Sequence, residues 1–458
     1  MPLMVSVSGV RGIVGKDLTP PVIEQYLKAF LRLLGKTSGK VLVGRDTRKS
    51  GTAIQNIVQS TVLSLGYDVV DIGVAATPTV LFNTRKLGCI GGIAITASHN
   101  PHQWNALKFC TERGLFLDEK STENLKLHTE SIHQNSLDKK TEENPGVLFH
   151  EKTAGSIHIQ GVMGILHPHL IPRKKLRVAV DPGGGAASEI NRSFLEQMGC
   201  EVFGINETAG SRFPRGPEPV PRNLHHLEKL VKDSKADVGF AQDPDGDRLS
   251  VVAETAQAVG EEYTLVLAGE SFLRNHKTDI ACNLSTSMMM DDLAGRFGVK
   301  VYRTKIGEIH VTRTLLQHNL GYGGEGNGGV IVPEVNPCRD SILGMGLILE
   351  LLAGSEKSLS QIIKTFPAYV MKKYKFPLAS RKLNEREEFY HRLYSKCREY
   401  FSGYRFDTQD GVKIYSNTEW LHIRRSNTEP VVRITSESKT HTRSDALIEA
   451  GKSLAESI

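Results

Sequence analysis

The sequence predicts an α/β protein with three similarly built α/β domains and a smaller C-terminal α+β domain. The chain has 458 residues, and a domain holds roughly 100–200 residues, so several domains are expected. A layout of strand, polar loop, helix, glycine and strand also occurs three times, at residues 40–72, 176–203 and 279–302. The residues after 366 follow a different pattern.

Each of the three repeats ends its helix at a glycine. The predicted helices span residues 53–65, 188–198 and 288–297, and they are followed by Gly66, Gly199 and Gly298. Glycine at this position adopts the left-handed conformation that ends a helix. The β-branched run that follows is then expected to pair with the first strand as a parallel neighbour.

The C-terminal part reads as alternating segments with a charged helix at 384–400, short strands near 411–415 and 420–424, and a closing helix at 444–455. This pattern is typical of a small α+β domain. The predicted domains are residues 1–150, 151–254, 255–366 and 367–458.

Composition argues against several classes of protein. The net charge is +6, from 57 basic and 51 acidic residues without a long Lys/Arg block, so no nucleic-acid partner is expected. A mild positive excess also suits a small anionic substrate. The six cysteines form no C-x-x-C pair, which argues against a zinc site or a disulfide framework and favours a reducing compartment.

No segment predicts membrane insertion or export. The first residues show no basic region followed by an apolar core, so we expect no signal peptide. The longest apolar run, residues 342–353, carries Glu350 and is too short to span a bilayer. We therefore expect a buried helix there, a cytoplasmic protein and no membrane partner.

Ser98 lies in the motif T-A-S-H-N-P, residues 96–101, directly after an apolar strand at 91–95. Open α/β sheets bind ligands at the carboxyl ends of their strands, which makes Ser98 a candidate nucleophile. The adjacent His99 does not imply a Ser-His-Asp triad, because no G-x-S-x-G elbow is present. Taken alone, the motif is equally compatible with a polar turn.

Asp243, Asp245 and Asp247 alternate in the motif D-P-D-G-D-R, which Arg248 completes. Hard oxygen ligands in one tight loop suit Mg²⁺. Gly246 is fourth in the loop whereas an EF-hand needs glycine sixth, so a calcium sensor is a poor match. Carboxylates this close repel one another without a cation, which makes a merely solvated acidic loop the weaker interpretation.

Two further motifs are candidate substrate-binding loops. The glycine-rich run 323–329 contains Glu325 and Asn327, and a strand rather than a helix follows it, so the dinucleotide interpretation of its G-x-G-x-x-G fails. The run R-R-S-N-T-E-P at 424–430, followed by Arg433, suits a phosphate dianion. A hairpin turn and a polar turn with surface arginines are the respective alternatives.

In this order the four motifs resemble those of the alpha-D-phosphohexomutase superfamily, and the resemblance runs from Arg11 to Arg433. It implies four domains around a central cleft: three similar α/β domains with mixed sheets and a smaller C-terminal α+β domain. It also implies a phosphohexomutase that interconverts hexose 6-phosphate and hexose 1-phosphate, acts as a monomer or homodimer, and uses Mg²⁺ and catalytic amounts of a hexose bisphosphate for priming.

The resemblance also implies a role for each motif. Ser98 would carry the phosphoryl group, Arg11 and Lys108 would handle protons and charge, and His99 would orient Ser98. Metal would be held by Ser98, Asp243, Asp245 and Asp247. The residues expected to bind substrate are Arg248, Lys305, Gly307, Glu308, Glu325, Asn327, Gly328, Arg424, Ser426, Asn427, Thr428 and Arg433.

Departures from the family pattern bear on the backbone and on the substrate. Ala106 stands where the family has glycine in N-G-x-K, so the backbone before Lys108 is expected to differ. Glu308 replaces the histidine of K-T-G-H that is typical of glucose and mannose mutases, and an acidic residue there favours a cationic amino sugar. Glucosamine phosphate is therefore the preferred substrate, with glucose or mannose phosphate as alternatives. Cys338, before Arg339, has no assigned function.

Two rival functions from other classes stay open. A sugar-phosphate hydrolase built on the same loops would release phosphate without isomerisation. A non-catalytic phosphosugar-binding protein would keep the fold without turnover, although the intact serine and aspartates argue against it.

Overall fold

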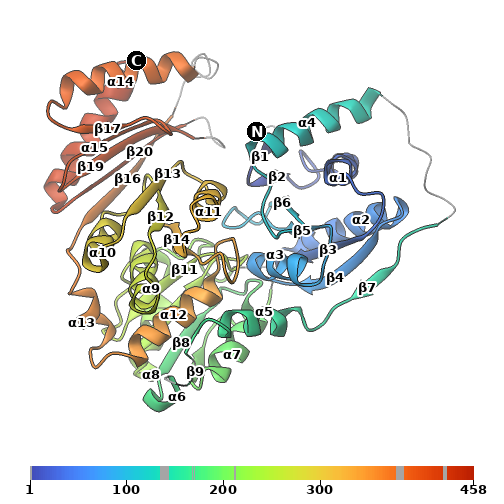
Figure 1. The fold of residues 1–458 in the computed structure, drawn as a ribbon, viewed down its shortest axis with the longest axis horizontal. Coiled ribbons are helices and arrows are strands. Elements are labelled where there is room, and N and C mark those ends of the chain that lie inside the picture. Colours follow the sequence, from blue (N-terminus) through green and yellow to red (C-terminus); the bar gives the residue numbers. More distant parts are fainter. Residues whose placement is uncertain are drawn as a thin grey trace. The chain divides into compact units, whose positions relative to one another are not determined.

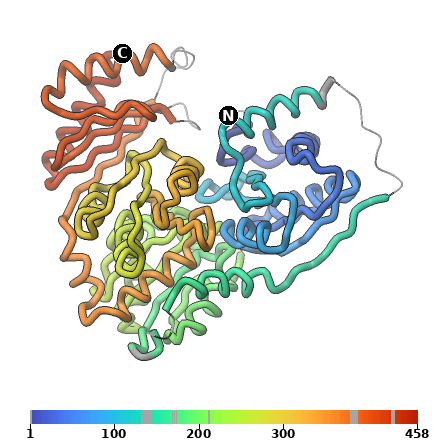
Figure 2. The backbone as a smooth tube through the Cα atoms, viewed as in Figure 1, coloured from blue at the N-terminus to red at the C-terminus, as the bar shows by residue number. Residues whose placement is uncertain are grey.

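The computed structural model describes residues 3–134, 144–167, 169, 171–210, 213–377, 386–426 and 431–458. The chain forms two compact units. Figures 1 and 2 trace its course from the N-terminus to the C-terminus. The first unit comprises Met1–His276 with Asn327–Gln361, and the second comprises Lys277–Gly326 with Ile362–Ile458. In the part of the chain that the structure describes, no helix combines the length and apolar character needed to cross a membrane.

The first sheet of the first unit is mixed and has the order β1-β2-β6-β5-β3-β4-β7. Strand β3 runs parallel to its neighbours β4 and β5, whereas β6 is antiparallel to β2 and β5. The strands are β1 (Met4–Ser6), β2 (Gly9–Ile13), β3 (Lys40–Arg45), β4 (Asp68–Val74), β5 (Gly91–Ile95), β6 (Trp104–Thr111) and β7 (Leu148–His150). The helices of this region are α1 (Pro20–Leu34), α2 (Lys49–Ser64), α3 (Thr77–Lys86) and α4 (Glu119–Gln134).

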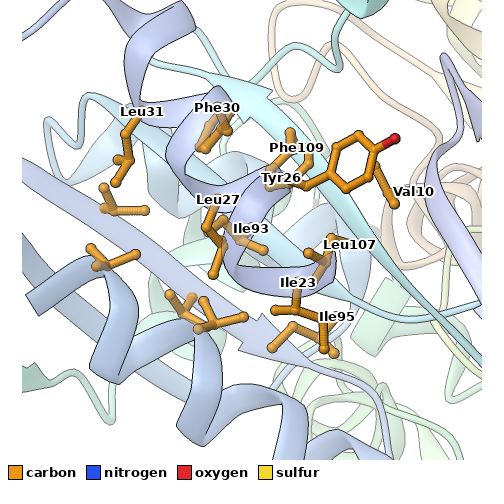
Figure 3. Close-up of a cluster of buried hydrophobic side chains, with 14 of the residues drawn as sticks. Val10, Ile23, Tyr26, Leu27, Phe30, Leu31, Ile93, Ile95, Leu107 and Phe109 are labelled. Atoms are coloured by element: carbon orange, nitrogen blue, oxygen red, sulfur yellow. The ribbon is translucent and has the colours of Figure 1, made fainter. Parts of the chain in front are cut away.

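Alternating side chains of β3 give this sheet two buried faces. Val41 and Val43 belong to an apolar cluster with residues of α1 and α2, and Leu42 belongs to another with Val80 of α3. Figure 3 shows the first cluster, where side chains of α1 meet those of β5 and β6. The sheet is therefore covered on both sides, and functional side chains are placed at the ends of its strands.

The second sheet has the order β11-β10-β8-β9, with β10 parallel to β8 and antiparallel to β11. Its strands are β8 (Arg177–Asp181), β9 (Glu201–Gly204), β10 (Val238–Gln242) and β11 (Leu249–Ala253). The accompanying helices are α5 (Ala154–Met163), α6 (Ile171–Lys174), α7 (Ser188–Gln197), the 3₁₀ turn η2 (Pro221–Asn223), α8 (His225–Ser234) and α9 (Glu261–Asn275).

The first unit also includes β15 (Gly329–Ile331) and α12 (Ser341–Ala353), and α13 (Leu359–Ile363) begins in it. Helix α12 packs beside α9 (Figure 1) and is buried along its length from Ser341 to Leu352, which confirms the buried helix expected at 342–353. Cys338, just before α12, is 1% exposed and packs in the apolar cluster with Leu42 and Cys110. Its contribution is therefore to packing.

The second unit begins with the parallel strands β12 (Ile280–Asn283), β13 (Val301–Thr304) and β14 (Tyr322–Glu325), in the order β13-β12-β14. Helices α10 (Met289–Phe297) and α11 (Glu308–Gln317) accompany them. A five-stranded antiparallel sheet follows, in the order β16-β20-β19-β18-β17. It comprises β16 (Val370–Pro377), β17 (Arg405–Asp407), β18 (Val412–Tyr415), β19 (Trp420–Arg425) and β20 (Val431–Ser438), with α14 (Arg386–Tyr400) and α15 (His441–Glu456).

The antiparallel sheet has one apolar and one polar face. On the apolar face, Val432 and Ile434 of β20 pack with residues of α14 and α15. On the polar face, His422 Nδ1 lies 2.8 Å from Ser285 Oγ, and Lys413 Nζ donates to the backbone oxygen of Leu284 at 2.5 Å. The polar face therefore contacts the loop that follows β12.

The predicted fold class is confirmed: three α/β sheets and a smaller C-terminal α+β domain. All three repeats adopt the expected layout, and Gly66, Gly199 and Gly298 have φ of 80°, 77° and 64°. Helix α2 begins at Lys49, earlier than predicted, and α15 begins at His441 after the capping residue Thr440. The domain boundaries near 150, 254 and 366 and the central cleft stay predictions.

Candidate active site

Ser98 sits in a buried turn after β5 with an unusual backbone conformation. Its φ is 49°, in the left-handed region, and the residue is 4% exposed. The backbone N–H of Ser98 donates to Thr96 Oγ1 at 3.0 Å. The Arg48 guanidinium donates to the backbone oxygens of Ser98 and Asn100, at 2.5 and 2.8 Å, and Asp46 holds Arg48 Nε at 2.9 Å. These contacts fix a conformation that costs about 1–3 kcal/mol when unsupported.

The loop between β10 and β11 is a tight turn in which Gly246 is required. Its φ is 67°, and its N–H donates to the backbone oxygen of Asp243 at 3.0 Å. A Cβ on Gly246 would lie 3.0 Å from Cβ of Ala76 and 3.1 Å from Cβ of Ala187. The turn therefore packs closely between two segments, and alternate residues of the loop direct their carboxylates to the same place.

Asp243 connects the loop to Ser98. Its Oδ1 accepts from the backbone N–H groups of Asp247 and Arg248, each at 3.1 Å. Its Oδ2 accepts from Ser98 Oγ at 3.0 Å. Burial and then the charges of Asp247 and Asp245 raise the pKa of Asp243 well above its usual value.

Asp245 is paired with a buried lysine. Its Oδ2 accepts from Lys108 Nζ at 2.6 Å and from Thr77 Oγ1 at 2.8 Å. Burial would raise the pKa of Asp245, but the positive charge of Lys108 prevails and lowers it. Its other oxygen, Oδ1, is buried and has no hydrogen-bond partner among the described residues.

Within the described residues, Asp247, like Asp245, has hydrogen-bond partners at only one of its two carboxylate oxygens. Its Oδ2 accepts from Arg339 Nη2 at 2.5 Å, and Lys108 Nζ lies 4.0 Å from the same oxygen. Its Oδ1 is buried without a hydrogen-bond partner in the described part of the chain, and Arg248 Nε lies 3.8 Å away. Asp245 and Asp247 therefore each have one carboxylate oxygen that is bonded to the protein and one that is available to another ligand.

These residues fit a divalent metal ion. One ligand atom from each of Asp243, Asp245 and Asp247 lies within 4.8 Å of the others. Hard oxygens are the ligands that Mg²⁺ prefers. A cation there would satisfy the buried oxygens of Asp245 and Asp247 and would relieve the repulsion that raises the pKa of Asp243.

Arg11 and His99 border Ser98. Arg11 donates from Nη1 to Asn100 Oδ1 at 2.5 Å, and burial lowers its pKa to about 10, so it stays charged at neutral pH. His99 Nδ1 lies 3.4 Å from Ser98 Oγ. The charge of Arg248, together with burial, lowers the pKa of His99 well below its usual value, so the ring is neutral at pH 7.

In the second unit, several predicted residues meet at the carboxyl ends of β12, β13 and β14. Glu325 is 4% exposed, and its Oε1 accepts from Asn283 Nδ2 at 2.8 Å and from the N–H of Gly307 at 3.0 Å. Gly307 has φ of 124° and precedes α11, whose first residue is Glu308. Lys305, two residues earlier, is exposed.

Asn327 and Gly328 lie in the first unit instead. Gly328 has φ of 85°, and its backbone oxygen accepts from the N–H of Leu249 at 3.0 Å. A Cβ there would lie 2.0 Å from the backbone oxygen of Leu249, so close packing against β11 accounts for this glycine. Its substrate contact stays a prediction, as does that of Asn327.

The C-terminal sheet sets basic residues opposite one another. Arg424 of β19 pairs with Arg433 of β20, which in turn pairs with Lys375 of β16. Asp410 Oδ2 lies 3.9 Å from Arg424 Nη1. Directly opposed residues of an antiparallel pair share a face, so this row of cations (Lys375, Arg433 and Arg424) is suited to an anion.

The loop that follows this row is described only in part. The N–H of Ser426 donates to the backbone oxygen of Val431 at 2.8 Å and closes the β19–β20 hairpin. Burial and the charge of Arg433 lower the pKa of Arg424, with Asp410 opposing them. Asn427 and Thr428 lie outside the described residues.

Comparisons with known proteins identify the family. Residues 3–136, 158–257 and 260–369 match the models of the phosphoglucomutase/phosphomannomutase alpha/beta/alpha domains I, II and III. The chain belongs to the alpha-D-phosphohexomutase superfamily. It is 34% identical to a phosphoglucomutase/phosphomannomutase of Thermococcus kodakarensis, covering 98% of this chain and 97% of that protein.

Other relatives of this phosphohexomutase differ in name. A probable phosphoglucosamine mutase of Methanopyrus kandleri is 32% identical and covers 96% of this chain and 95% of its own. Among solved structures, a putative phosphomannomutase from Thermus thermophilus has the same fold, with a TM-score of 0.83 at 24% identity, covering 100% of this chain and 99% of its own. The protein is a phosphohexomutase, and hence an intramolecular phosphotransferase.

The candidate site also includes residues outside the predicted set. Arg48 fixes the Ser98 turn, Thr77 holds Asp245, Arg339 holds Asp247, and Asn283 holds Glu325. The G-R-D-T-R turn at 44–48 was a visible signal for the first of these residues.

Ala106 does not disturb the strand that carries Lys108, and the expected difference from the family's backbone stays a prediction. Ala106 lies inside β6, in regular register with Arg11 of β2, and has no positive φ. The strand therefore delivers Lys108 to Asp245 without a glycine.

Proposed function

We propose that this phosphohexomutase interconverts hexose 6-phosphate and hexose 1-phosphate through a phosphoserine at Ser98 and a hexose bisphosphate, with glucosamine phosphate as its preferred substrate. The observation that carries the proposal is the placement of Ser98 Oγ 3.0 Å from Asp243 Oδ2, beside two carboxylates that each have a buried oxygen without a hydrogen-bond partner among the described residues. A nucleophile at a metal loop is what phosphoryl transfer needs.

Metal binding is assigned to Ser98, Asp243, Asp245 and Asp247. When bound there, Mg²⁺ supplies charge neutralisation for the phosphoryl group that moves between Ser98 and the sugar. Lys108 holds Asp245 in place through its 2.6 Å contact, and Arg248 lies 4.0 Å from Asp243 and 3.8 Å from Asp247. Both cations stabilise negative charge that develops during transfer.

Ser98 is positioned by the residues around it. Arg48 and Thr96 fix its backbone, and the neutral ring of His99 orients its hydroxyl. Arg11, charged and tied to Asn100, contributes positive charge at the same loop. Positioning and charge neutralisation supply most of the catalysis of phosphoryl transfer, and these side chains provide both.

One turnover consists of two phosphoryl transfers. Phosphoserine gives its phosphoryl group to the sugar, which becomes a bisphosphate, and the other phosphate then returns to Ser98. A trace of hexose bisphosphate primes the enzyme. The row of Lys375, Arg433 and Arg424 grips the phosphate that is not reacting. Because it recognises a phosphate rather than a ring face, this row accepts either end of the sugar.

Two carboxylates favour an amino sugar. Glu308 begins α11 beside Gly307, and the N–H of Gly307 donates to Glu325. Acidic side chains at the sugar-binding edge attract the ammonium group of glucosamine. The names of the relatives support either an amino sugar or a neutral sugar, so glucose or mannose phosphate is the alternative substrate.

A turnover panel tests the proposal. Purified protein with Mg²⁺ and a trace of hexose bisphosphate is given glucosamine, glucose, mannose and N-acetylglucosamine phosphates in turn, and product is followed by phosphorus NMR. We expect the highest kcat/KM with glucosamine phosphate. Higher values with glucose or mannose phosphate would overturn the substrate choice. Inorganic phosphate as the only product would identify a hydrolase, and no turnover after priming would identify a binding protein.

A matched variant tests the reason for the substrate choice. Glu308→Gln keeps the size of the side chain and removes its charge. If Glu308 recognises the ammonium group, the variant loses its preference for glucosamine over glucose phosphate while turnover of glucose phosphate is kept. An unchanged preference would remove Glu308 from the argument.

A further inference from the structure

A short turn before α12 lies directly against the metal loop. Arg339 Nη2 donates to Asp247 Oδ2 at 2.5 Å, and Ser341 Oγ donates to the backbone oxygen of Gly246 at 2.6 Å. Between them, Asp340 caps α12 by accepting from the N–H groups of Ile342 and Leu343. Three consecutive residues therefore connect α12 to the loop that carries the aspartates.

The turn is itself fixed from the other side. Asp340 Oδ2 lies 2.7 Å from His158 Nε2, and both side chains are fully buried. His158 Nδ1 lies 3.0 Å from Thr79 Oγ1, and Asn336 Nδ2 donates to Asp340 Oδ2 at 3.2 Å. Because Asp340 uses one oxygen for the helix cap and the other for His158, the orientation of the turn is determined by contacts with α3 and α5.

The path of the Arg339 side chain is equally confined. Arg339 is 9% exposed, and a Cβ on Gly329 would lie 2.1 Å from its Cδ. The absence of a side chain at Gly329 therefore leaves the channel through which Arg339 reaches Asp247. Because both its aliphatic part and its guanidinium group are confined, Arg339 has little freedom to break its hydrogen bond to Asp247 Oδ2.

We propose that Arg339 is a positioning residue that keeps Asp247 a one-oxygen ligand and thereby favours Mg²⁺ over Ca²⁺. The inference rests on the proposed metal site. Arg339 occupies Oδ2 of Asp247, so Oδ1 is the oxygen left to face the metal. Mg²⁺ needs near-octahedral geometry, whereas Ca²⁺ takes more ligands and accepts two oxygens from one carboxylate. Blocking the second oxygen therefore penalises Ca²⁺.

His158 acts on the same property through Asp340. It touches neither the aspartates of the loop nor Ser98 in any contact of the described residues, but it fixes the turn that carries Arg339. Replacing it should loosen Arg339 and shift metal preference in the same direction, by a smaller factor.

Metal competition tests the proposal without relying on activity. Free Mn²⁺ is measured by EPR, and Mg²⁺ and Ca²⁺ are titrated against it for the full chain and for Arg339→Met, Arg339→Lys and His158→Gln. The quantity compared is the ratio of the Kd for Ca²⁺ to the Kd for Mg²⁺. We expect Arg339→Met to lower this ratio by about tenfold, and Arg339→Lys and His158→Gln to lower it by about threefold.

Arg85→Met is the matched control. Arg85 Nη2 donates to the backbone oxygen of Val335 at 2.5 Å, so it supports the same segment without contacting the metal loop. Its loss should lower thermal stability and leave the ratio unchanged. If Arg339→Met does not fold, Arg339→Lys and His158→Gln carry the test.

The outcomes separate this inference from the function on which it rests. Equal fold-changes in both Kd values, which leave the ratio unchanged, would mean that Arg339 acts only through its charge, and no change in either Kd value would mean that it is only structural. Either result overturns the inference while leaving the metal site intact. If the full chain binds Mn²⁺ no better than an Asp247→Asn variant, the proposed metal site itself fails.

Discussion

In the first unit each carboxylate of the Asp243–Asp247 loop meets a cation or a backbone donor, whereas in the second unit cations stand opposite one another. Lys108 lies 2.6 Å from Asp245, and Arg339 lies 2.5 Å from Asp247. On the C-terminal sheet, Arg424 and Arg433 occupy directly opposed positions. The first region sets cations against its carboxylates but leaves one buried oxygen each of Asp245 and Asp247 for a metal ion, and the second places like charges in direct register.

The two charge arrangements suit two different tasks, phosphoryl transfer in the first region and phosphate binding in the second. Phosphoryl transfer is most efficient when dipoles and charges are already in place, since no reorganisation is then needed. A site that binds a phosphate reversibly gains from clustered positive charge, which attracts the anion. We therefore infer that the region with Ser98 is built for chemistry and the C-terminal sheet for reversible binding.

The largest effect is expected at Ser98. Ser98→Ala removes the oxygen that would carry the phosphoryl group, so mutase turnover should fall by on the order of 10³-fold or more. Phosphorus NMR with primed protein measures the loss. Gln103→Ala, an exposed position in the same loop, is the control and should keep full activity. Turnover at the unmodified rate in Ser98→Ala would show that another residue carries the phosphoryl group.

The basic row should show a smaller effect that depends on the ligand. Arg424→Gln and Arg433→Gln each remove a charge-assisted contact to phosphate, so the KM for hexose phosphate should rise by about tenfold. Arg405→Gln, an exposed position on β17 of the same sheet, should leave the KM unchanged. Unchanged KM in both test variants would place the phosphate elsewhere.

The same pair also tests whether the row is strained without a ligand. A double-mutant cycle compares the free energies of unfolding of the two single variants and the double variant. Like charges directly opposed destabilise, so the coupling should be repulsive by about 0.2–1 kcal/mol without phosphate. The protein has two tryptophans, and a Trp104→Phe background leaves Trp420, in β19, as the fluorescence reporter. An attractive coupling would contradict the contrast between the two regions.

Much of the fold and of the candidate site could be predicted from the sequence, because it depends on local sequence patterns. The repeats, the Ser98 turn and the Asp243–Asp247 loop each depend on residues close together in the chain. Arg339 could not be assigned in the same way, because its function depends on the turn before α12 meeting a loop 92 residues earlier. Lys375 was missed because only the register of β16 with β20 sets it opposite Arg433.

The two units also differ in how a buried lysine is paired. Lys108 is paired with a carboxylate, whereas Lys413 donates to the backbone oxygen of Leu284 at 2.5 Å. Burial and then the charge of Arg303 lower the pKa of Lys413 to about 7, from 10.5. Protonating Lys413 therefore costs stability in the folded protein, and the carbonyl offsets only part of that cost.

The lowered pKa of Lys413 makes the free energy of unfolding depend on pH. Between pH 7 and 10.5 the unfolded chain binds a proton at Lys413 that the folded chain does not, so stability rises with pH in that window. The penalty is fully present below pH 7. Unfolding by urea, followed through Trp420 at pH 7.5 and 8.5, should give a rise of about 1 kcal/mol that Lys413→Met abolishes. Lys372→Met, which removes a partly exposed ion pair between β16 of the same sheet and Asp445 of α15, should keep the rise. If the free energy of unfolding of Lys413→Met rises by the same amount, Lys413 is charged in the folded protein, and it does not differ from Lys108 in this respect.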